Sequence, residues 1–324
     1  MFLENQVFQG TVWGPCFWNC FYSDAGKAVQ DLGFTDVVYA DDFNSFKFYA
    51  RAVPNHEIYQ DLRACQQNLH RWGAGNQVVF DGSKESFAIL SNTDADGESF
   101  RLLGIDFDCK LQMGACVHEC ATSAAWKLRT IMRTRRFFTD AELILFFKSH
   151  ILSYIEYRTP AVFHAATSTL NEIDDILTRF LRKIGISQDD AFMYFNLAPL
   201  RLRREISILG LIHRTVLGKG PSHFRQFFER DHSVPAFRSA RRHNKQLLDI
   251  RNSPRSLNLA RHSPLGMASI YNLLPQHVVD IKSVSKFQRA LTNIVRERVS
   301  GSDRLAYDIF CPRLPLAHHP LICR

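Results

Sequence analysis

Hydrophobic and polar positions in the first part of the chain predict a hairpin followed by a helix. Two short runs rich in Val, Tyr and Phe, at 37–39 and 45–48, flank a polar stretch that favours a turn. Apolar side chains then recur at steps of three and four from 58 to 72, which indicates one face of a helix. Pro54 suits the first turn of this helix and Gly73 suits its end.

Alternation of apolar and polar residues predicts more strands before the pattern changes. An Asp-Gly pair at 81–82 favours a turn between two of them. We expect strands at 78–80, 87–90 and 102–107, with a polar loop over 92–97.

Helical spacing dominates from about residue 120 onward. A capping box at Thr169–Glu172 predicts a helix start, and Gly185 and Gly218 predict helix ends. Residues 219–262 are rich in Arg, His and Ser without periodicity, which indicates a basic linker. The expected class is therefore α+β, an antiparallel part followed by an all-α part. Helices are predicted over 123–136, 140–155, 169–184, 200–217 and 285–299.

Composition indicates a globular protein with an uneven charge. Of 324 residues, 46% are hydrophobic and 22% are charged. No apolar run reaches bilayer length, and the first ten residues do not resemble a secretory signal. Residues 1–199 hold 18 Lys and Arg against 24 Asp and Glu, a net of −6, whereas residues 200–324 hold 22 against 8, a net of +14. The basic part predicts contact with a polyanion, or a solvated basic tail.

An adjacent carboxylate pair is the sharpest chemical feature. Asp41 and Asp42 follow Tyr39 and Ala40 where the hairpin should turn. Nucleotidyl transfer with two Mg²⁺ ions uses clustered carboxylates, because hard cations prefer oxygen ligands. Neighbouring strand residues point to opposite faces, so a full site needs a further carboxylate from elsewhere. The alternative is an ordinary Asx-rich turn.

Zinc is not expected. The segment from Cys116 to Cys120 has metal-capable residues but no second pair at the spacing of structural zinc. A C-terminal group also lacks that spacing, and consists of Cys311, His318, His319 and Cys323.

Ordered motifs around the carboxylate pair resemble the reverse transcriptases of non-LTR (LINE-like) retrotransposons. The segment Phe8–Pro15 is similar to the Pro-Gln-Gly-Ser-x-Leu-Gly-Pro segment of that family, and Tyr39–Asp42 is similar to its Tyr-Ala-Asp-Asp box. Phe8 and Trp13 depart from the family pattern. The resemblance continues with Trp72, Asn76, Phe80 and Lys84, with Leu103–Ile105, with Leu197–Leu211, with Tyr271–Pro275 and with Ser285–Leu291.

The resemblance implies roles for particular residues. Asp41 and Asp42 would hold Mg²⁺, and Lys84 would act on the leaving pyrophosphate, unless it is simply a solvated lysine. Leu103 and Gly104 would form the primer grip. Gln9, Gly10 and Tyr39 would line the template and nucleotide loop, where glycine allows close backbone approach.

Two groups of cations are candidates for contacts with the nucleic-acid backbone. Arg133, Arg135 and Arg136 lie at a predicted helix end, where cations also interact favourably with the helix dipole. The second group lies in the basic stretch at 238–261, and includes Arg241, Arg242 and Lys245.

The resemblance implies an RNA-directed DNA polymerase fragment, with an RNA template, a DNA primer and dNTP as partners. The sequence does not fix the location, which we expect to be intracellular, and the resemblance is compatible with the nucleus. The first catalytic Asp of the family lies upstream of the Gln-Gly segment, so we expect this chain to lack it and to be inactive alone. An upstream polymerase part would then be a partner. The alternatives are a non-catalytic nucleic-acid-binding module, the product of a decayed reading frame, or an unrelated interaction domain. The predicted parts are a partial palm (1–115), a helical thumb (116–220), a basic linker (221–262) and a C-terminal helical segment (263–324).

Overall fold

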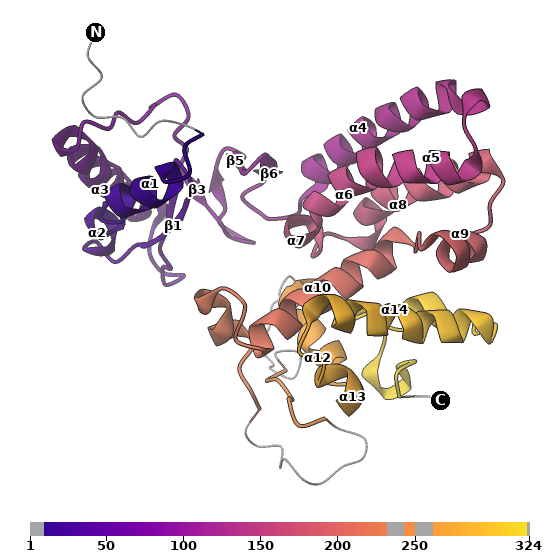
Figure 1. Cartoon of the computed structure of the whole chain (residues 1–324). Helices are drawn as coiled ribbons and strands as arrows, with labels where there is room; N and C mark the ends of the chain where they lie inside the picture. The colour runs from indigo at the N-terminus through magenta and orange to yellow at the C-terminus, as the bar shows by residue number, and fades with distance from the viewer. Residues whose placement is uncertain (1–9, 232–242, 250–261, 323–324) are drawn as a thin grey trace. The chain divides into compact units, whose positions relative to one another are not determined.

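The computed structural model describes residues 10–231, 243–249 and 262–322. The chain forms two compact units, residues 1–100 and 101–324. Figure 1 shows short antiparallel strands in the first part of the chain and mostly helices in the second. The expected α+β class is confirmed.

From residue 10 to residue 100, the first unit combines three helices with short hairpins. Its two longest strands form an antiparallel pair in which Thr35 lies opposite Phe46 and Tyr39 opposite Asp42. Its elements are α1 (Gly14–Tyr22), α2 (Ala25–Gln30), β1 (Thr35–Tyr39), β2 (Asp42–Phe46), α3 (Asn55–Gly75), β3 (Ala88–Ile89) and β4 (Asp96–Gly97).

The core of the first unit is small and lies on one face of the β1–β2 hairpin. Val29, Phe34 and Cys65 are buried, and Phe43 packs against them. Because side chains alternate along a strand, this places the Phe43 face of the hairpin against the helices. Apolar side chains remain exposed on the opposite face, at Val37, Tyr39 and Phe46.

The second unit is mostly helical. It begins with the pair β5 (Phe100–Leu102) and β6 (Ile105–Phe107). Its helices are α4 (Gly114–Arg133), η1 (Arg135–Phe137), α5 (Asp140–Phe146), η2 (Phe147–Leu152), α6 (Ser153–Tyr157), α7 (Thr159–Val162), α8 (Thr167–Ile184), α9 (Gln188–Phe195), α10 (Leu200–Val216), η3 (Ser222–Phe227), η5 (Pro264–Met267), α12 (Ala268–Tyr271), α13 (Gln276–Val279), α14 (Val284–Ser300), η6 (Ala306–Asp308) and η7 (Leu316–His318).

The first core of this unit lies between α4, the α5–η2–α6 rod and α8. Phe147 stacks on Phe180 with ring centroids 4.4 Å apart, and both side chains are fully buried. The rod is α-helical at both ends and π-helical over η2. Helices α4 and α8 run parallel, since His118 pairs with Glu172 near their starts and Arg135 donates to Lys183 near their ends.

A second core joins α10, α12 and α14. His213 is fully buried, stacks on Phe287 and hydrogen-bonds both the Tyr271 hydroxyl and the Ile281 carbonyl. Burial lowers the pKa of His213, so the imidazole is held neutral inside this core. The helices around it cross closely in Figure 1.

Two strand predictions were wrong. Residues 78–80 do not form a strand, and Val79 is 94% exposed. The strand that pairs with β3 is β4. The run at 102–107 is not one strand, because Leu103 and Gly104 both have positive φ and form a turn. The run contains the end of β5, this turn and β6.

The helix predictions held in outline, with corrections at their starts. Helix α4 begins at Gly114 rather than at 123, and α9 was not predicted. The capping box forms at Thr139 and Glu142, whereas the one predicted at Thr169 lies inside α8. Gly185 and Gly218 do follow helix ends, with left-handed φ of 76° and 72°. No helix in the described ranges is long and apolar enough to cross a bilayer.

Candidate functional site

The carboxylate pair lies at the tip of the β1–β2 hairpin. Ala40 and Asp41 form a two-residue connection, and Tyr39 and Asp42 are the last paired residues of the strands. Ala40 has φ of 55°, a left-handed conformation that a two-residue hairpin turn requires. Both Asp side chains are therefore held at a fixed, exposed turn.

Helix α1 anchors this turn. Trp18 donates a hydrogen bond from Nε1 to the Ala40 carbonyl, with a donor–acceptor distance of 2.8 Å. The indole also stacks on Tyr22, one helical turn further along, at 5.0 Å. The hairpin tip is thus tied to α1 at the residue beside Asp41.

Tyr22 lies in an aromatic cluster next to the hairpin tip, where it stacks on Trp18. Its side chain is buried, and it meets Phe43 and Trp72 edge to face at 6.2 Å and 5.4 Å. Burial raises the pKa of the Tyr22 phenol, and the negative charge of Asp41 raises it further. Trp72 in turn donates to Asp24 at 3.1 Å, which fixes the aromatic cluster to the start of α2.

The chemistry of the tip suits a hard cation but is incomplete. Asp41 and Asp42 are exposed oxygen donors of the kind that Mg²⁺ prefers. Across the part of the chain that the structure describes, no group of three or more His, Cys, Asp or Glu side chains could hold a metal ion. A two-metal site at this turn would therefore need at least one more carboxylate.

The segment before α1 contains one of the predicted loop residues. Gly10 adopts φ of 86°, which only glycine takes up readily. The Thr11 hydroxyl accepts a hydrogen bond from the Gly14 amide at the start of α1. Trp13 is 67% exposed beside it. Gln9 lies outside the described residues.

Lys84 is separate from the carboxylate pair. Its ammonium group lies 3.5 Å from the Asp81 carboxylate in an exposed turn, and its side chain is 83% exposed. Within the described residues it makes no ion pair with Asp41 or Asp42. The role predicted for Lys84 remains a prediction.

The predicted primer-grip residues form the tip of the β5–β6 hairpin. Leu103 and Gly104 have φ of 49° and 75°, the positive pair of a type I′ turn. The Tyr157 hydroxyl donates to the Leu103 carbonyl at 2.7 Å and ties this tip to α6. The Leu103 side chain is 40% exposed.

Cations from two helices meet at one end of the first helical core. Because α4 and α8 are parallel, the predicted group at Arg133, Arg135 and Arg136 lies beside the end of α8. That helix ends with exposed Arg179, Arg182 and Lys183. Arg136 stacks over Phe137 at 4.7 Å, and Phe137 is 68% exposed. The α8 cations were not predicted from the sequence, because no linear pattern indicates that two helices run parallel.

The other predicted candidates lie in different surroundings. The Lys245 ammonium group donates a hydrogen bond to the Val279 carbonyl at 2.6 Å and forms an ion pair with Asp280 at 3.4 Å. Cys116 and Cys120 are buried on α4, and burial raises the pKa of the Cys120 thiol to about 11. Arg241, Arg242 and Cys323 lie outside the described residues.

Comparison of the chain with protein-family models, with curated proteins and with solved structures gives no match. The site must therefore be interpreted from its own residues. Of these, Trp18 and Tyr22 were not singled out from the sequence, although their spacing of four on a helix could have indicated a shared aromatic face.

Proposed function

We propose that this chain is the palm-and-thumb part of an RNA-directed DNA polymerase of the retrotransposon type. In this proposal the first unit is the partial palm that carries Asp41 and Asp42. The helical bundle around α4 and α8 is the thumb, which holds template and primer. Catalysis in this proposal needs a further carboxylate beside Asp41 and Asp42, so we expect no primer extension by the chain alone.

The observation that carries the proposal is the buttressed tip of the β1–β2 hairpin. A plain Asx-rich turn needs no support from another element. Here Trp18 donates to the Ala40 carbonyl beside Asp41, and Tyr22 stacks on Trp18. Such support keeps two adjacent carboxylates in one place, as catalysis by positioned charge requires. The tip lies in chain order between the motifs that resemble the polymerase family.

The cations on α4 and α8 support the nucleic-acid part of the proposal. Arg133, Arg136, Arg179, Arg182 and Lys183 are exposed, and none forms an ion pair within the described ranges. Five solvated charges beside an exposed aromatic ring suit a phosphate backbone. The helix dipoles also favour cations at these ends, so charge placement alone does not require a ligand.

In the proposed reaction, this chain positions groups around the primer end. Asp41 and Asp42 would hold Mg²⁺, which lowers the barrier by neutralising charge on the transferred phosphoryl group. Trp18 and Tyr22 would keep both carboxylates in register with the primer. The Leu103–Gly104 turn would contact the primer, and the α4–α8 cations would bind its backbone.

Primer extension and template binding together test the proposal. The full 324-residue chain and its Asp41→Ala, Asp42→Ala variant would be incubated with an oligo(dT)-primed RNA template, dTTP or dATP as the template requires, and Mg²⁺. Asp31→Ala is the matched control, since it removes an exposed carboxylate of the same unit outside the hairpin. We expect salt-sensitive binding of the template by all three proteins and no extension.

Each result separates the alternatives. Extension that Asp41→Ala, Asp42→Ala abolishes and Asp31→Ala retains would establish an active polymerase and disprove the expected inactivity. Extension that survives in the double variant would disprove the assigned site. Failure to bind primer–template even at low salt would overturn the polymerase proposal altogether.

A binding module without catalysis is the second candidate, favoured by the clustered cations. Replacing Arg133, Arg136 and Arg182 with Gln would then lower the dependence of the affinity on salt by about 0.9 per lost phosphate contact on duplex DNA. Lys282→Gln, at an exposed position away from the cluster, is the control and should change little. An unchanged salt dependence would show that the cations serve only the helix ends.

A further inference from the structure

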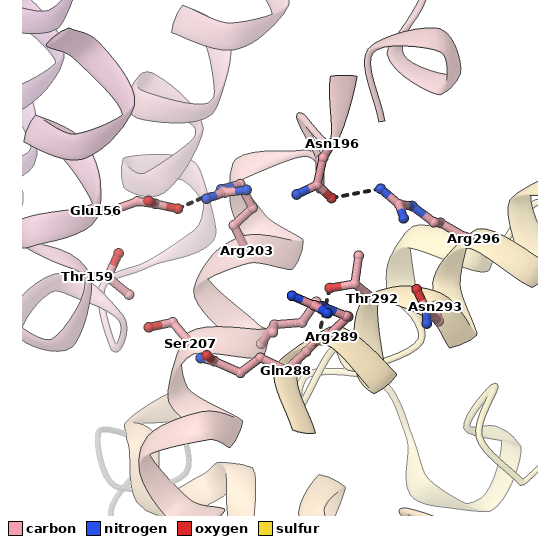
Figure 2. A pocket seen from close by; sticks show the side chains of 12 residues that line it. Glu156, Thr159, Asn196, Arg203, Ser207, Gln288, Arg289, Thr292, Asn293 and Arg296 are labelled. Carbon is pink, nitrogen blue, oxygen red and sulfur yellow. Dashed lines mark hydrogen bonds and ion pairs between the residues drawn. The ribbon is translucent and has the colours of Figure 1, made fainter. Parts of the chain in front are cut away.

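A polar pocket of about 590 Å³ lies within the second unit. Residues of α6, α7, α10 and α14 line it, and Figure 2 shows their polar side chains around it. The volume falls within the range of small-molecule sites. It belongs neither to the hairpin tip nor to the α4–α8 cations.

The pocket holds more positive than negative charge. Arg203 is neutralised by Glu156, whose carboxylate lies 2.6 Å from the Arg203 Nε. The side chain of Arg289 has no hydrogen bond or ion pair within the described residues. Arg296 donates only to the neutral Asn196 amide oxygen at 2.9 Å. Two positive charges are thus left without a counter-charge.

Arg296 also has an unsatisfied donor. Its Nε is buried and has no hydrogen-bond partner within the described residues. The rest of the guanidinium is half-buried, donates to Asn196 and lies over the Phe192 ring at 5.5 Å, and none of these contacts supplies a negative charge. An anion in the pocket would supply that charge to the accessible guanidinium nitrogens.

The spacing on α14 sets the shape of a ligand. Arg289 and Arg296 are seven residues apart, which is two helical turns or about 10 Å along the axis on the same face. Thr292 and Asn293 lie between them, and Ser207 lies across the pocket on α10. Figure 2 shows hydroxyl, amide and guanidinium groups on both walls. No aromatic side chain lines the pocket.

We propose that this pocket binds a small phosphorylated ligand of about nucleotide size that carries at least two anionic groups. Guanidinium groups match phosphate oxygens through paired hydrogen bonds, and hydroxyl and amide donors complete such a site. The positive charge disfavours a metal cation, and the polar lining disfavours an apolar ligand. This site is independent of the polymerase proposal, so either can fail alone.

Calorimetric titration of the full chain with sodium pyrophosphate tests the site. We expect saturable binding that Arg289→Gln and Arg296→Gln each weaken by at least about tenfold, because each removes a charge-assisted contact. Arg304→Gln makes the same change at an exposed position outside the pocket, and should leave the affinity unchanged. Circular dichroism would verify that each variant is folded.

Arg289 decides the outcome if the partly buried Arg296 variant does not fold, since Arg289 is exposed. Arg289→Lys should then retain part of the affinity that Arg289→Gln loses. No binding of pyrophosphate, or equal binding by wild type and Arg289→Gln, would overturn the proposal.

Competition identifies the source of the phosphate. Displacement of pyrophosphate by a 5′-phosphorylated oligonucleotide, but not by the same oligonucleotide with a 5′-hydroxyl, would assign the pocket to a nucleic-acid end. Displacement by neither would assign it to a free phosphorylated metabolite. Equal displacement by both would show general polyanion binding and would contradict a built phosphate site.

Discussion

The two units bury their apolar residues very differently. The core cluster of the first unit has three buried side chains, and Val37, Tyr39 and Phe46 lie exposed on its main hairpin. The second unit encloses two large helical cores, with rings such as Phe147 and Phe287 at 0% exposure. Hydrophobic burial is the main source of stability, so we infer that the second unit is the more stable one.

The comparison also extends to charge. In the first unit, Lys47 and Asp61 form an ion pair at 2.8 Å with 27% and 46% of their side chains exposed. In the second unit, Glu205 is 2% exposed and one of its carboxylate oxygens has no hydrogen-bond partner within the described residues. Water solvates the charges of Lys47 and Asp61 whether or not they pair, so this ion pair adds little stability, whereas the protonation and stability of Glu205 depend on the fold around it.

Phe147→Ala should have the largest effect. It removes a fully buried ring that stacks on Phe180, and should lower the free energy of unfolding by about 3–5 kcal/mol. Phe46→Ala, at a 43% exposed position of the first unit, is the comparison and should cost less than about 1 kcal/mol. Chemical denaturation followed by far-ultraviolet circular dichroism would measure both. Similar losses of unfolding free energy in both variants would contradict the inferred difference in burial between the units.

Glu205→Gln should change how stability depends on pH. Burial raises the pKa of Glu205 to about 8, while Arg201 and Arg204 oppose the shift. The folded state therefore holds a proton that the unfolded chain releases near pH 4.5, so stability is greatest at low pH and is lost as the pH rises through 8. At pH 9 the variant should be more stable than wild type by about 1–3 kcal/mol.

Thermal unfolding between pH 5 and pH 9 would measure this effect. Glu297→Gln, at an exposed position of α14, is the matched control and should keep the wild-type profile. We expect the melting temperature of the wild type to fall more than that of Glu205→Gln between pH 5 and pH 9. The same change in both proteins would disprove the role of Glu205.

Trp18→Phe should have a smaller effect, confined to the first unit. The change keeps an aromatic ring beside Tyr22 but removes the donor to the Ala40 carbonyl, so about 1 kcal/mol should be lost. Intrinsic fluorescence suits the measurement, since Trp13 and Trp72 remain in the same unit. Phe17→Leu on the exposed side of α1 is the control. Equal stability of Trp18→Phe and wild type would remove the evidence that α1 anchors the turn.

Ala40→Gly should give the smallest effect, and of opposite sign. Ala40 has φ of 55°, which costs an alanine about 1 kcal/mol relative to glycine, so the variant should gain roughly that amount less the extra chain entropy. Denaturation followed by tryptophan fluorescence would detect the gain. A loss of stability would indicate that the alanine methyl group contributes packing at the tip.

The sequence predicted most clearly what depends on local pattern. Helices α3, α8, α10 and α14 follow apolar spacing, and the β1–β2 hairpin follows two apolar runs around a polar turn. What it could not predict depends on contacts between distant residues. The β3–β4 pairing, the parallel course of α4 and α8 and the Trp18–Ala40 bond join positions that no periodicity connects.

The candidate site divides along the same line. The position of Asp41 and Asp42 at a turn was predictable, because two short apolar runs flank a polar stretch that favours a turn. The support behind them was not predictable, nor was the exposure of Lys84 beside Asp81. The arginine pocket is the extreme case, since Arg203 and Arg296 are brought to one cavity by helices far apart in the sequence.

The π-helical stretch η2 lets its rod hold one residue more than a plain α-helix of the same course. A π turn contains one residue more than an α turn, so the side chains that follow it keep their direction around the axis. Glu156 and Tyr157 lie after this stretch, where they contact Arg203 and the Leu103 carbonyl. Deleting one residue between 147 and 152 should therefore convert η2 to an α turn and leave both contacts in place. Inserting a residue after 152 has no such outlet and should rotate Glu156 and Tyr157 by about 100° away from their partners.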